Sequence, residues 1–102
     1  MTYDVVIIGA GPAGYTAGIY CSRARHSTVL ISGLLPGGQL MNTTDVENYP
    51  GFDEGVMGPD LMQTMRKQTE RMGTEIVDDV VTSVDFTQKP LKVATASMTF
   101  EA

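Results

Sequence analysis

The sequence predicts an α/β fold with a parallel sheet, and three observations carry this prediction. A β-branched apolar run over 5–8 leads directly into a glycine-rich turn. Small residues at helical spacing follow that turn, and a second unbroken apolar run occupies 28–32. At 102 residues the chain has the size of one small domain, so we treat residues 1–102 as a single unit.

The first strand is expected over 3–8, and the turn after it has the spacing Gly-x-Gly-x-x-Gly. In such a turn Gly9 permits the tight exit from the strand, and Gly11 lets the backbone approach phosphates. Gly14 lets the following helix press against the sheet. Pro12 suits the first helical turn, where its missing N–H costs nothing. This context favours dinucleotide binding over an ordinary glycine-rich turn.

The helix is expected over 12–24 and the second strand over 28–32. The single cysteine, Cys21, excludes an internal disulfide and is predicted to be a small buried hydrophobe rather than a catalytic thiol. Ser32 stands where a nucleotide-binding unit often carries a carboxylate for a ribose hydroxyl. A hydroxyl can still bind ribose, so this departure weakens an NAD interpretation more than nucleotide binding in general. His26 is predicted to be a solvated turn residue.

Between 33 and 59 the chain has many glycines and prolines and little periodicity. A segment of this length without regular structure is uncommon in a compact domain unless it is functional or disordered. Its apolar side chains argue against disorder; they are Leu40, Met41, Val46, Tyr49 and Phe52. We therefore expect a loop that wraps around a ligand.

A second helix is expected over 59–72, with Gly73 as its stop. Its core stripe is Leu61, Met62, Met65, Thr69 and Met72, and its solvated face is Arg66, Lys67, Glu70 and Arg71. Further strands are expected at about 74–77, 80–86, 91–96 and 98–101. Asp78 and Asp79 could suggest a carboxylate pair for acid–base catalysis, but adjacent residues of a strand would face opposite ways. We therefore interpret them as a solvated turn.

Composition excludes several function classes. A net charge of −5 argues against a nucleic-acid partner, which requires basic patches. No metal site is predicted, because the methionines are expected in the core and His26 lacks ligands at a suitable spacing. The apolar run at 5–8 is too short for a signal peptide or a membrane span, so we expect a soluble chain in the cytoplasm or an organelle matrix.

Several motifs occur in the order found in one known family. They are Gly9–Gly14, Pro36-Gly37-Gly38-Gln39-Leu40, the stretch Thr43–Gly51 with Asn48-Tyr49-Pro50-Gly51, Gly58–Met62, Arg66–Gly73 and Val81–Lys89. Over nearly all of its length the chain resembles low-molecular-weight thioredoxin reductases. The resemblance implies the first portion of an FAD-binding domain over residues 1–102. This domain is Rossmann-like and three-layered, with a parallel sheet and a β-meander.

The resemblance also implies which residues contact FAD. Ala10 to Ala13 would cradle the pyrophosphate, and Ser32 and Gly33 would lie beside the adenosine ribose. The complete set of implied contacts is Gly9, Ala10, Gly11, Pro12, Ala13, Gly14, Ser32, Gly33, Gly37, Gly38, Gln39, Leu40, Asn48 and Val81. Within it, residues 38–40 would run past the flavin ring, Asn48 would contact the ring, and the Val81 backbone would meet the adenine. Taken singly, Gly37-Gly38 and Pro50-Gly51 could also be simple hairpin turns.

Members of this family pass electrons from NADPH through FAD to a Cys-x-x-Cys pair and on to thioredoxin. That pair and the NADPH-binding domain are absent from these residues, so no catalytic residue is assigned and we expect a longer, homodimeric parent protein. One alternative is a related flavoprotein reductase that serves ferredoxin or a peroxidase partner. Another is a non-catalytic nucleotide-binding module.

Overall fold

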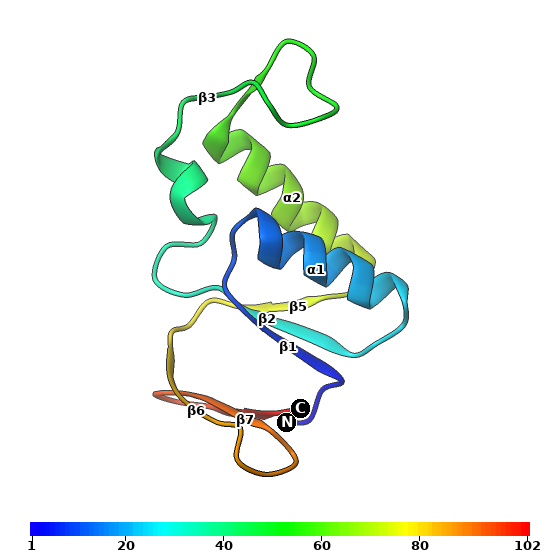
Figure 1. The fold of residues 1–102 in the computed structure, drawn as a ribbon, viewed down its shortest axis with the longest axis vertical. Helices are drawn as coiled ribbons and strands as arrows, with labels where there is room; N and C mark the ends of the chain where they lie inside the picture. The colour runs from blue at the N-terminus through cyan, green and yellow to red at the C-terminus, as the bar shows by residue number, and fades with distance from the viewer.

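The computed structural model describes residues 1–102 as a three-layer α/β arrangement (Figure 1). Two helices lie on one side of a parallel sheet and an antiparallel sheet lies on the other, which confirms the predicted architecture. In chain order the elements are β1 (Val5–Ile8), α1 (Pro12–Arg23), β2 (Thr28–Ile31), the 3-10 helix η1 (Gly38–Asn42), β3 (Asp45–Val46), β4 (Val56–Met57), α2 (Gly58–Met72), β5 (Glu75–Val77), β6 (Val81–Asp85), β7 (Lys92–Thr95) and β8 (Thr99–Glu101).

The parallel sheet has the strand order β1-β2-β5. Val29, Leu30 and Ile31 of the central strand β2 are fully buried, as the unbroken apolar run predicts. Ile31 lies opposite Ile8 of β1 on one side and opposite Val77 of β5 on the other. All three strands therefore end at the same edge of the sheet, and β1 forms one side of it.

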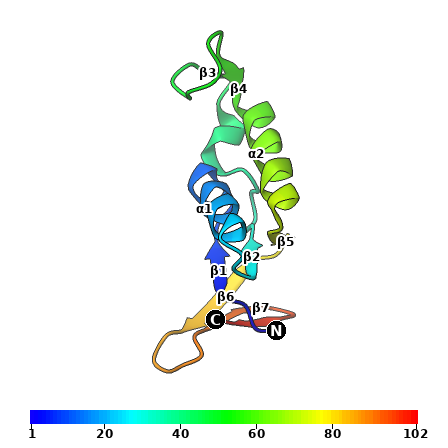
Figure 2. The same ribbon diagram turned by 90° about the vertical axis from the view of Figure 1, so that its right-hand side faces the viewer.

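The two helices pack against each other and against one face of the parallel sheet (Figures 1 and 2). Their interface contains hydroxyl groups as well as apolar side chains. The Thr69 hydroxyl donates a hydrogen bond to the Tyr15 carbonyl (3.1 Å), and the Thr74 hydroxyl donates one to the Gly18 carbonyl (3.0 Å). Since Gly18 has no side chain, both threonines reach the α1 backbone. These bonds fix how α1 sits on α2.

Four residues of the predicted core stripe of α2 are confirmed as buried, Leu61, Met62, Met65 and Thr69. The fifth, Met72, is only half-buried in the last turn of the helix. Leu61, Met62 and Met65 join Ala10, Tyr15, Leu30 and Val46 in the core on the helix side of the sheet. Cys21 is half-buried, so it is less enclosed than the buried hydrophobe that was predicted. His26 is exposed as expected, with its Nδ1 3.8 Å from an oxygen of the Asp4 carboxylate.

The antiparallel strands β6-β7-β8 form the predicted meander and cover the other face of the parallel sheet. Val93 and Phe100 of the meander pack on Val29 and Ile31 of β2 in a second core cluster. The first residues of the chain also join this layer. The Tyr3 N–H donates to the Glu101 carbonyl, and the Glu101 N–H donates to the Met1 carbonyl, both at 2.8 Å.

The segment from Gly33 to Met57 is more regular than expected. It contains η1 and an antiparallel pair of two-residue strands, in which Val46 lies opposite Val56. The expectation of a loop without regular structure is therefore wrong, because strands of two residues leave no periodicity that a sequence could reveal. Gly37 directly precedes η1 as its N-cap, with a φ of 97°, and is not part of a hairpin turn. Pro50 and Gly51 lie in the connection between β3 and β4.

Candidate functional site

The glycine-rich turn leaves the end of β1 and opens α1. The Gly9 N–H donates to the Ile31 carbonyl (2.9 Å), which ties the turn to the end of β2. A Cβ atom at Gly14 would lie 2.0 Å from the Gly9 carbonyl oxygen, so the helix approaches the turn as closely as the motif predicts. No side chain caps the first turn of α1, and that turn contains no acidic residue. Its amide groups are therefore free to bind an external anion.

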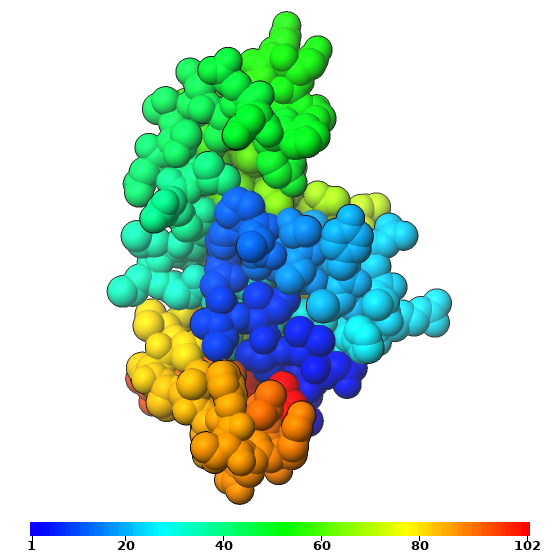
Figure 3. Space-filling model, in the orientation of Figure 1, coloured from blue at the N-terminus to red at the C-terminus, as the bar shows by residue number.

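The segment after β2 folds back onto this turn. The Gly37 N–H donates to the Ala10 carbonyl (2.6 Å), and a Cβ atom at Gly38 would lie 3.5 Å from the Cα of Gly11. Figure 3 shows this segment alongside the start of α1. Two glycine motifs that lie far apart in the sequence thus meet at one place. No atom lies within 4 Å of a Cβ built at Gly9, Gly11 or Gly33, so the surface here is open.

The residues after β2 and β5 lie side by side at the same edge of the sheet. The Ser32 N–H donates to the Val77 carbonyl, and the Gly33 N–H donates to the Asp79 carbonyl, both at 2.9 Å. Ser32 is buried, and its hydroxyl makes a long contact of 3.4 Å with the Gly33 carbonyl. Asp78 therefore stands beside the position at which the sequence places a hydroxyl instead of a carboxylate.

Asp78 does not belong to a freely solvated turn, and Arg66 does not lie simply on a solvated face. Both terminal nitrogens of Arg66 donate to the carboxylate of Asp78, at 2.9 and 2.8 Å. Only 27% of the Arg66 side chain is exposed, against 54% of the Asp78 side chain. The Arg66 guanidinium holds the pKa of Asp78 below its usual range, with a smaller contribution from the Ser32 hydroxyl and against the opposing effect of burial.

The remaining predicted contacts are spread over the molecule. Gln39 is exposed in η1, while Leu40 is half-buried against the core on the helix side. Asn48 is exposed in the connection between β3 and β4, at the opposite end of the molecule from the meander (Figure 1). Val81 begins β6 and packs on the core beneath the sheet. Residues 9–14, 32–33 and 37–38 lie together at the end of the parallel sheet, whereas Asn48 and Val81 lie in other parts of the molecule.

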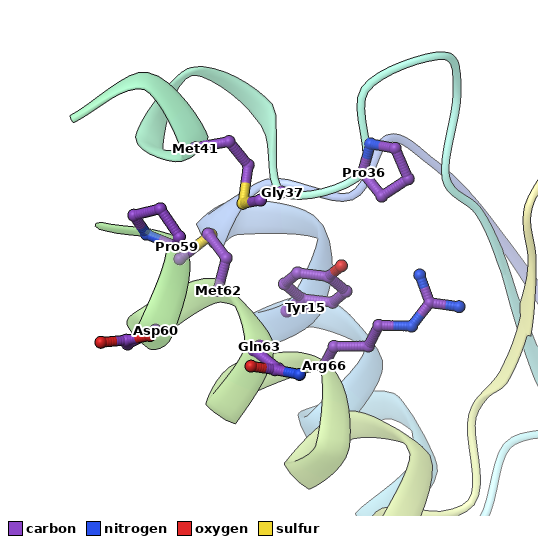
Figure 4. Close-up of a pocket in the computed structure, with 9 residues that line it drawn as sticks. All are labelled: Tyr15, Pro36, Gly37, Met41, Pro59, Asp60, Met62, Gln63 and Arg66. Atoms are coloured by element: carbon purple, nitrogen blue, oxygen red, sulfur yellow. The ribbon is translucent and has the colours of Figure 1, made fainter. Parts of the chain in front are cut away.

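A cavity of about 310 Å³ lies between α1, α2 and the segment 36–41 (Figure 4). Its lining residues are Tyr15, Pro36, Gly37, Met41, Pro59, Asp60, Met62, Gln63 and Arg66. Burial raises the pKa of Tyr15, against a smaller opposing effect of the Arg66 guanidinium. Gly37 is the only predicted contact residue in this lining, so the cavity is separate from the surface above the glycine-rich turn.

Sequence reasoning missed the pairing of Arg66 with Asp78. The two residues lie twelve positions apart, Arg66 on α2 and Asp78 directly after β5, and their contact depends on where α2 lies above β5. One signal in the sequence pointed toward it. Ser32 leaves the end of β2 without a carboxylate, and Asp78 directly follows the next parallel strand.

Comparison with known proteins agrees with this geometry. The profile of the pyridine nucleotide-disulphide oxidoreductase family matches residues 3–101. A thioredoxin reductase of Rickettsia bellii is 58% identical over 99 residues, which cover 97% of this chain and 32% of that protein. The NADPH-dependent thioredoxin reductase 3 of Arabidopsis thaliana is 54% identical over 97 residues, covering 91% of this chain and 18% of that protein.

Solved structures show the same relationship. The thioredoxin reductase from Giardia duodenalis superposes with a TM-score of 0.92 at 38% sequence identity, covering 98% of this chain and 33% of that one. The chain therefore spans about a third or less of the length of these relatives.

Proposed function

Because the chain belongs to the pyridine nucleotide-disulphide oxidoreductase family, we propose that residues 1–102 form the first portion of an FAD-binding domain. The protein that contains them would be an NADPH-dependent thioredoxin-disulfide reductase. The observation that carries this proposal is the meeting of Gly37 and Gly38 with the turn at Ala10 and Gly11. It places two stretches of exposed backbone around one open surface at the end of β1.

The residues at this surface suit a dinucleotide. The uncapped amides at the start of α1 offer hydrogen bonds and a positive dipole to a diphosphate. The open space around Gly9, Gly11 and Gly33 leaves room for a ligand to approach the backbone. No acidic side chain in the first turn of α1 opposes an anion there. These features support FAD binding on the physical chemistry of the chain, independently of its relatives.

Roles for the contact residues follow from these positions. In this proposal Gly9, Ala10, Gly11, Pro12, Ala13 and Gly14 hold the diphosphate, Ser32 and Gly33 meet the adenosine ribose, Gly37, Gly38, Gln39, Leu40 and Asn48 line the flavin ring, and the Val81 backbone meets the adenine. When bound, the flavin supplies the group that accepts a hydride and passes electrons on. The residues of this chain bind the cofactor, orient it and exclude water from one side.

The proposed reaction needs a dithiol in addition to the flavin. Cys21 is the only cysteine in the chain and lies half-buried in α1, so it does not provide such a pair. We therefore assign no thiol chemistry to residues 1–102. NADPH as electron donor and thioredoxin as partner are supported by the names of the relatives. A homodimer stays a prediction of the resemblance, and a cytoplasmic location stays a prediction from the sequence. Neither helix is long and apolar enough to cross a bilayer.

Titration of the flavin-free protein with FAD tests the proposal. We expect Gly11→Ala to raise the dissociation constant for FAD about tenfold or more, because a methyl group would enter the space assigned to the diphosphate. Without flavin, the free energy of unfolding of this variant should lie within about 0.5 kcal/mol of that of the unsubstituted protein, because the space is otherwise open. Gln68→Ala, on the exposed face of α2, is the control.

Two results would contradict the proposal. Unchanged FAD affinity in Gly11→Ala would show that the glycine-rich turn does not hold the diphosphate. A colourless protein that cannot be reconstituted with FAD would favour the non-catalytic nucleotide-binding module. For the protein that contains this chain, NADPH oxidation that depends on added thioredoxin would support the reductase activity. Oxidation that depends on ferredoxin instead would favour the related reductase.

A further inference from the structure

The end of β2 lacks a group that nucleotide-binding βαβ units ordinarily carry. In such units a carboxylate at this position accepts a hydrogen bond from a ribose hydroxyl. Here the position holds Ser32, whose hydroxyl is buried and lies 3.4 Å from the Gly33 carbonyl. To hold the ribose as firmly as a unit with that carboxylate does, this surface would need a carboxylate from another element.

The neighbouring strand β5 provides one. Ile31 and Val77 lie opposite each other as the last residues of β2 and β5, and the backbone bond from Ser32 to Val77 continues this pairing. Asp78 is the next residue along, so its carboxylate stands at the same edge as Ser32. More than half of the Asp78 side chain is exposed, and it is accessible to a ligand above the strand ends.

Arg66 fixes the orientation of this carboxylate. Its two hydrogen bonds occupy one lone pair on each oxygen of Asp78 and leave the other lone pairs available. A bidentate pair of this kind restricts the rotamers of both side chains more than a single bond would. Asp78 is thus held in place before any ligand arrives, as effective binding groups usually are.

The charges at this corner distinguish two kinds of adenosine ribose. Asp78 neutralises Arg66, and Glu70 lies 3.7 Å from the Nε atom of Arg66, so no cation remains free here. A 2′-hydroxyl can donate a hydrogen bond to Asp78. A 2′-phosphate, as in NADP, would bring its negative charge against the carboxylate, and Arg66 is already engaged.

We propose that Asp78, held by Arg66, supplies the carboxylate that β2 lacks and selects an adenosine ribose with a free 2′-hydroxyl over one that carries a 2′-phosphate. The proposal rests on the dinucleotide binding proposed above. It adds a specificity-determining residue directly after β5 and excludes 2′-phosphorylated dinucleotides from this surface.

The test compares three ligands with the purified, flavin-free protein: FAD, its analogue with 2′-deoxyadenosine, and its analogue with a 2′-phosphate on the adenosine. The parent protein should bind FAD about tenfold more tightly than the deoxy analogue, as expected for one hydrogen bond to a charged group. In Asp78→Asn this preference should fall to about threefold or less. The affinity for the 2′-phosphate analogue should rise at least about tenfold, because Arg66 is released.

Two further variants separate the effects. Asp79→Asn removes the adjacent carboxylate, whose bond from the Val80 N–H an asparagine can keep, and should retain the parent preferences. The double variant R66Q/D78N should lose the preference for FAD without gaining affinity for the 2′-phosphate. It also carries the comparison if Asp78→Asn alone does not fold with an unpaired arginine.

The possible failures are distinct. If the parent protein binds FAD and Asp78→Asn keeps the tenfold preference, Asp78 does not contact the ribose and this inference is wrong, while the proposed function stands. If the parent protein binds none of the three ligands, the proposed function itself is wrong. An Asp79→Asn variant that loses the preference as fully as Asp78→Asn would also overturn the assignment to Asp78.

Discussion

The sheet half of the molecule, formed by β1, α1, β2, α2 and β5, differs from the loop segment Gly33–Met57 in what holds its backbone. In the sheet half Val29, Leu30 and Ile31 are completely enclosed, and hydroxyl groups join the two helices. In the loop segment only Gly37 and Val46 are buried, while Leu34 and Leu35 are 83% and 73% exposed.

Besides the packing of Val46 and its half-buried apolar neighbours on the helix-side core, a few backbone contacts attach the loop segment. The Gly37 N–H bonds to Ala10, and the Gly58 N–H, at the start of α2, lies 3.2 Å from the Thr43 carbonyl and 3.1 Å from the Thr44 carbonyl. A segment attached at a few backbone points can leave its remaining groups available to a ligand, whereas a segment defined by burial cannot. Stability therefore lies mainly in the sheet half, whereas the proposed ligand-binding surface lies where the sheet half and the loop segment meet.

The largest expected effect is the destabilisation of the sheet half by a substitution at Gly14. Gly14→Ala would place a methyl group 2.0 Å from the Gly9 carbonyl oxygen, and neither backbone segment can move without disturbing β1 or α1. We expect the unfolding free energy to fall by at least about 2 kcal/mol, even though alanine favours a helix by about 1 kcal/mol. Urea denaturation measures the change. A protein as stable as the parent would show that α1 does not sit as closely on the turn as described.

A second substitution separates the two halves. Gly58→Ala would place its methyl group 2.0 Å from the Leu40 carbonyl oxygen and 2.4 Å from that of Thr43. We expect η1 to detach from α2 while the parallel sheet persists, with a loss of about 1–2 kcal/mol in unfolding free energy. Hydrogen exchange should show faster exchange in residues 38–46 and unchanged protection in β2. Equal acceleration in β2 would mean that the halves unfold as one unit.

The smallest expected effect concerns the ion pair at the end of β5. Because Arg66 lowers the pKa of Asp78 in the folded state, the pair stabilises the fold above the ordinary aspartate pKa of 3.8. This contribution is lost as the pH falls through the lowered folded value. Between about pH 5 and pH 2 the parent protein should therefore lose up to about 1 kcal/mol more stability than Asp78→Asn, a small amount because the pair is partly exposed.

Asp53→Asn serves as the control for this pH series, because Asp53 is an exposed carboxylate in the loop segment. Its stability should follow that of the parent protein across the range. Parallel curves for the parent protein and Asp78→Asn would show that the pair contributes nothing to folding.

Sequence reasoning predicted the sheet half well, because its signals are local. Apolar runs identified β1 and β2, glycine spacing identified the turn, and the methionine stripe identified the buried face of α2. The observed elements end within one or two residues of the expected positions. The strands of the meander were also expected, because turn residues separate them along the sequence. Their arrangement as a meander was implied by the resemblance.

The loop segment and the corner at Asp78 could be predicted only in part. Strands of two residues, such as β3 and β4, carry no period, and their pairing depends on how the whole segment folds. The bond between Arg66 and Asp78 requires the position of α2 above β5, which no local pattern encodes. The glycines at 37 and 38 were identified through the resemblance, whereas their contact with Ala10 and Gly11 became known from the structure.

The bonds between Glu101 and the first three residues bear on how the protein is made. The first three residues leave the ribosome about a hundred residues before Glu101, their partner in the meander, emerges. Contacts of such long sequence separation form late and slow the folding reaction. The nascent chain must therefore carry Val5–Ile8 with one sheet face uncovered until the meander strands have emerged, a period in which chaperone binding would be most useful.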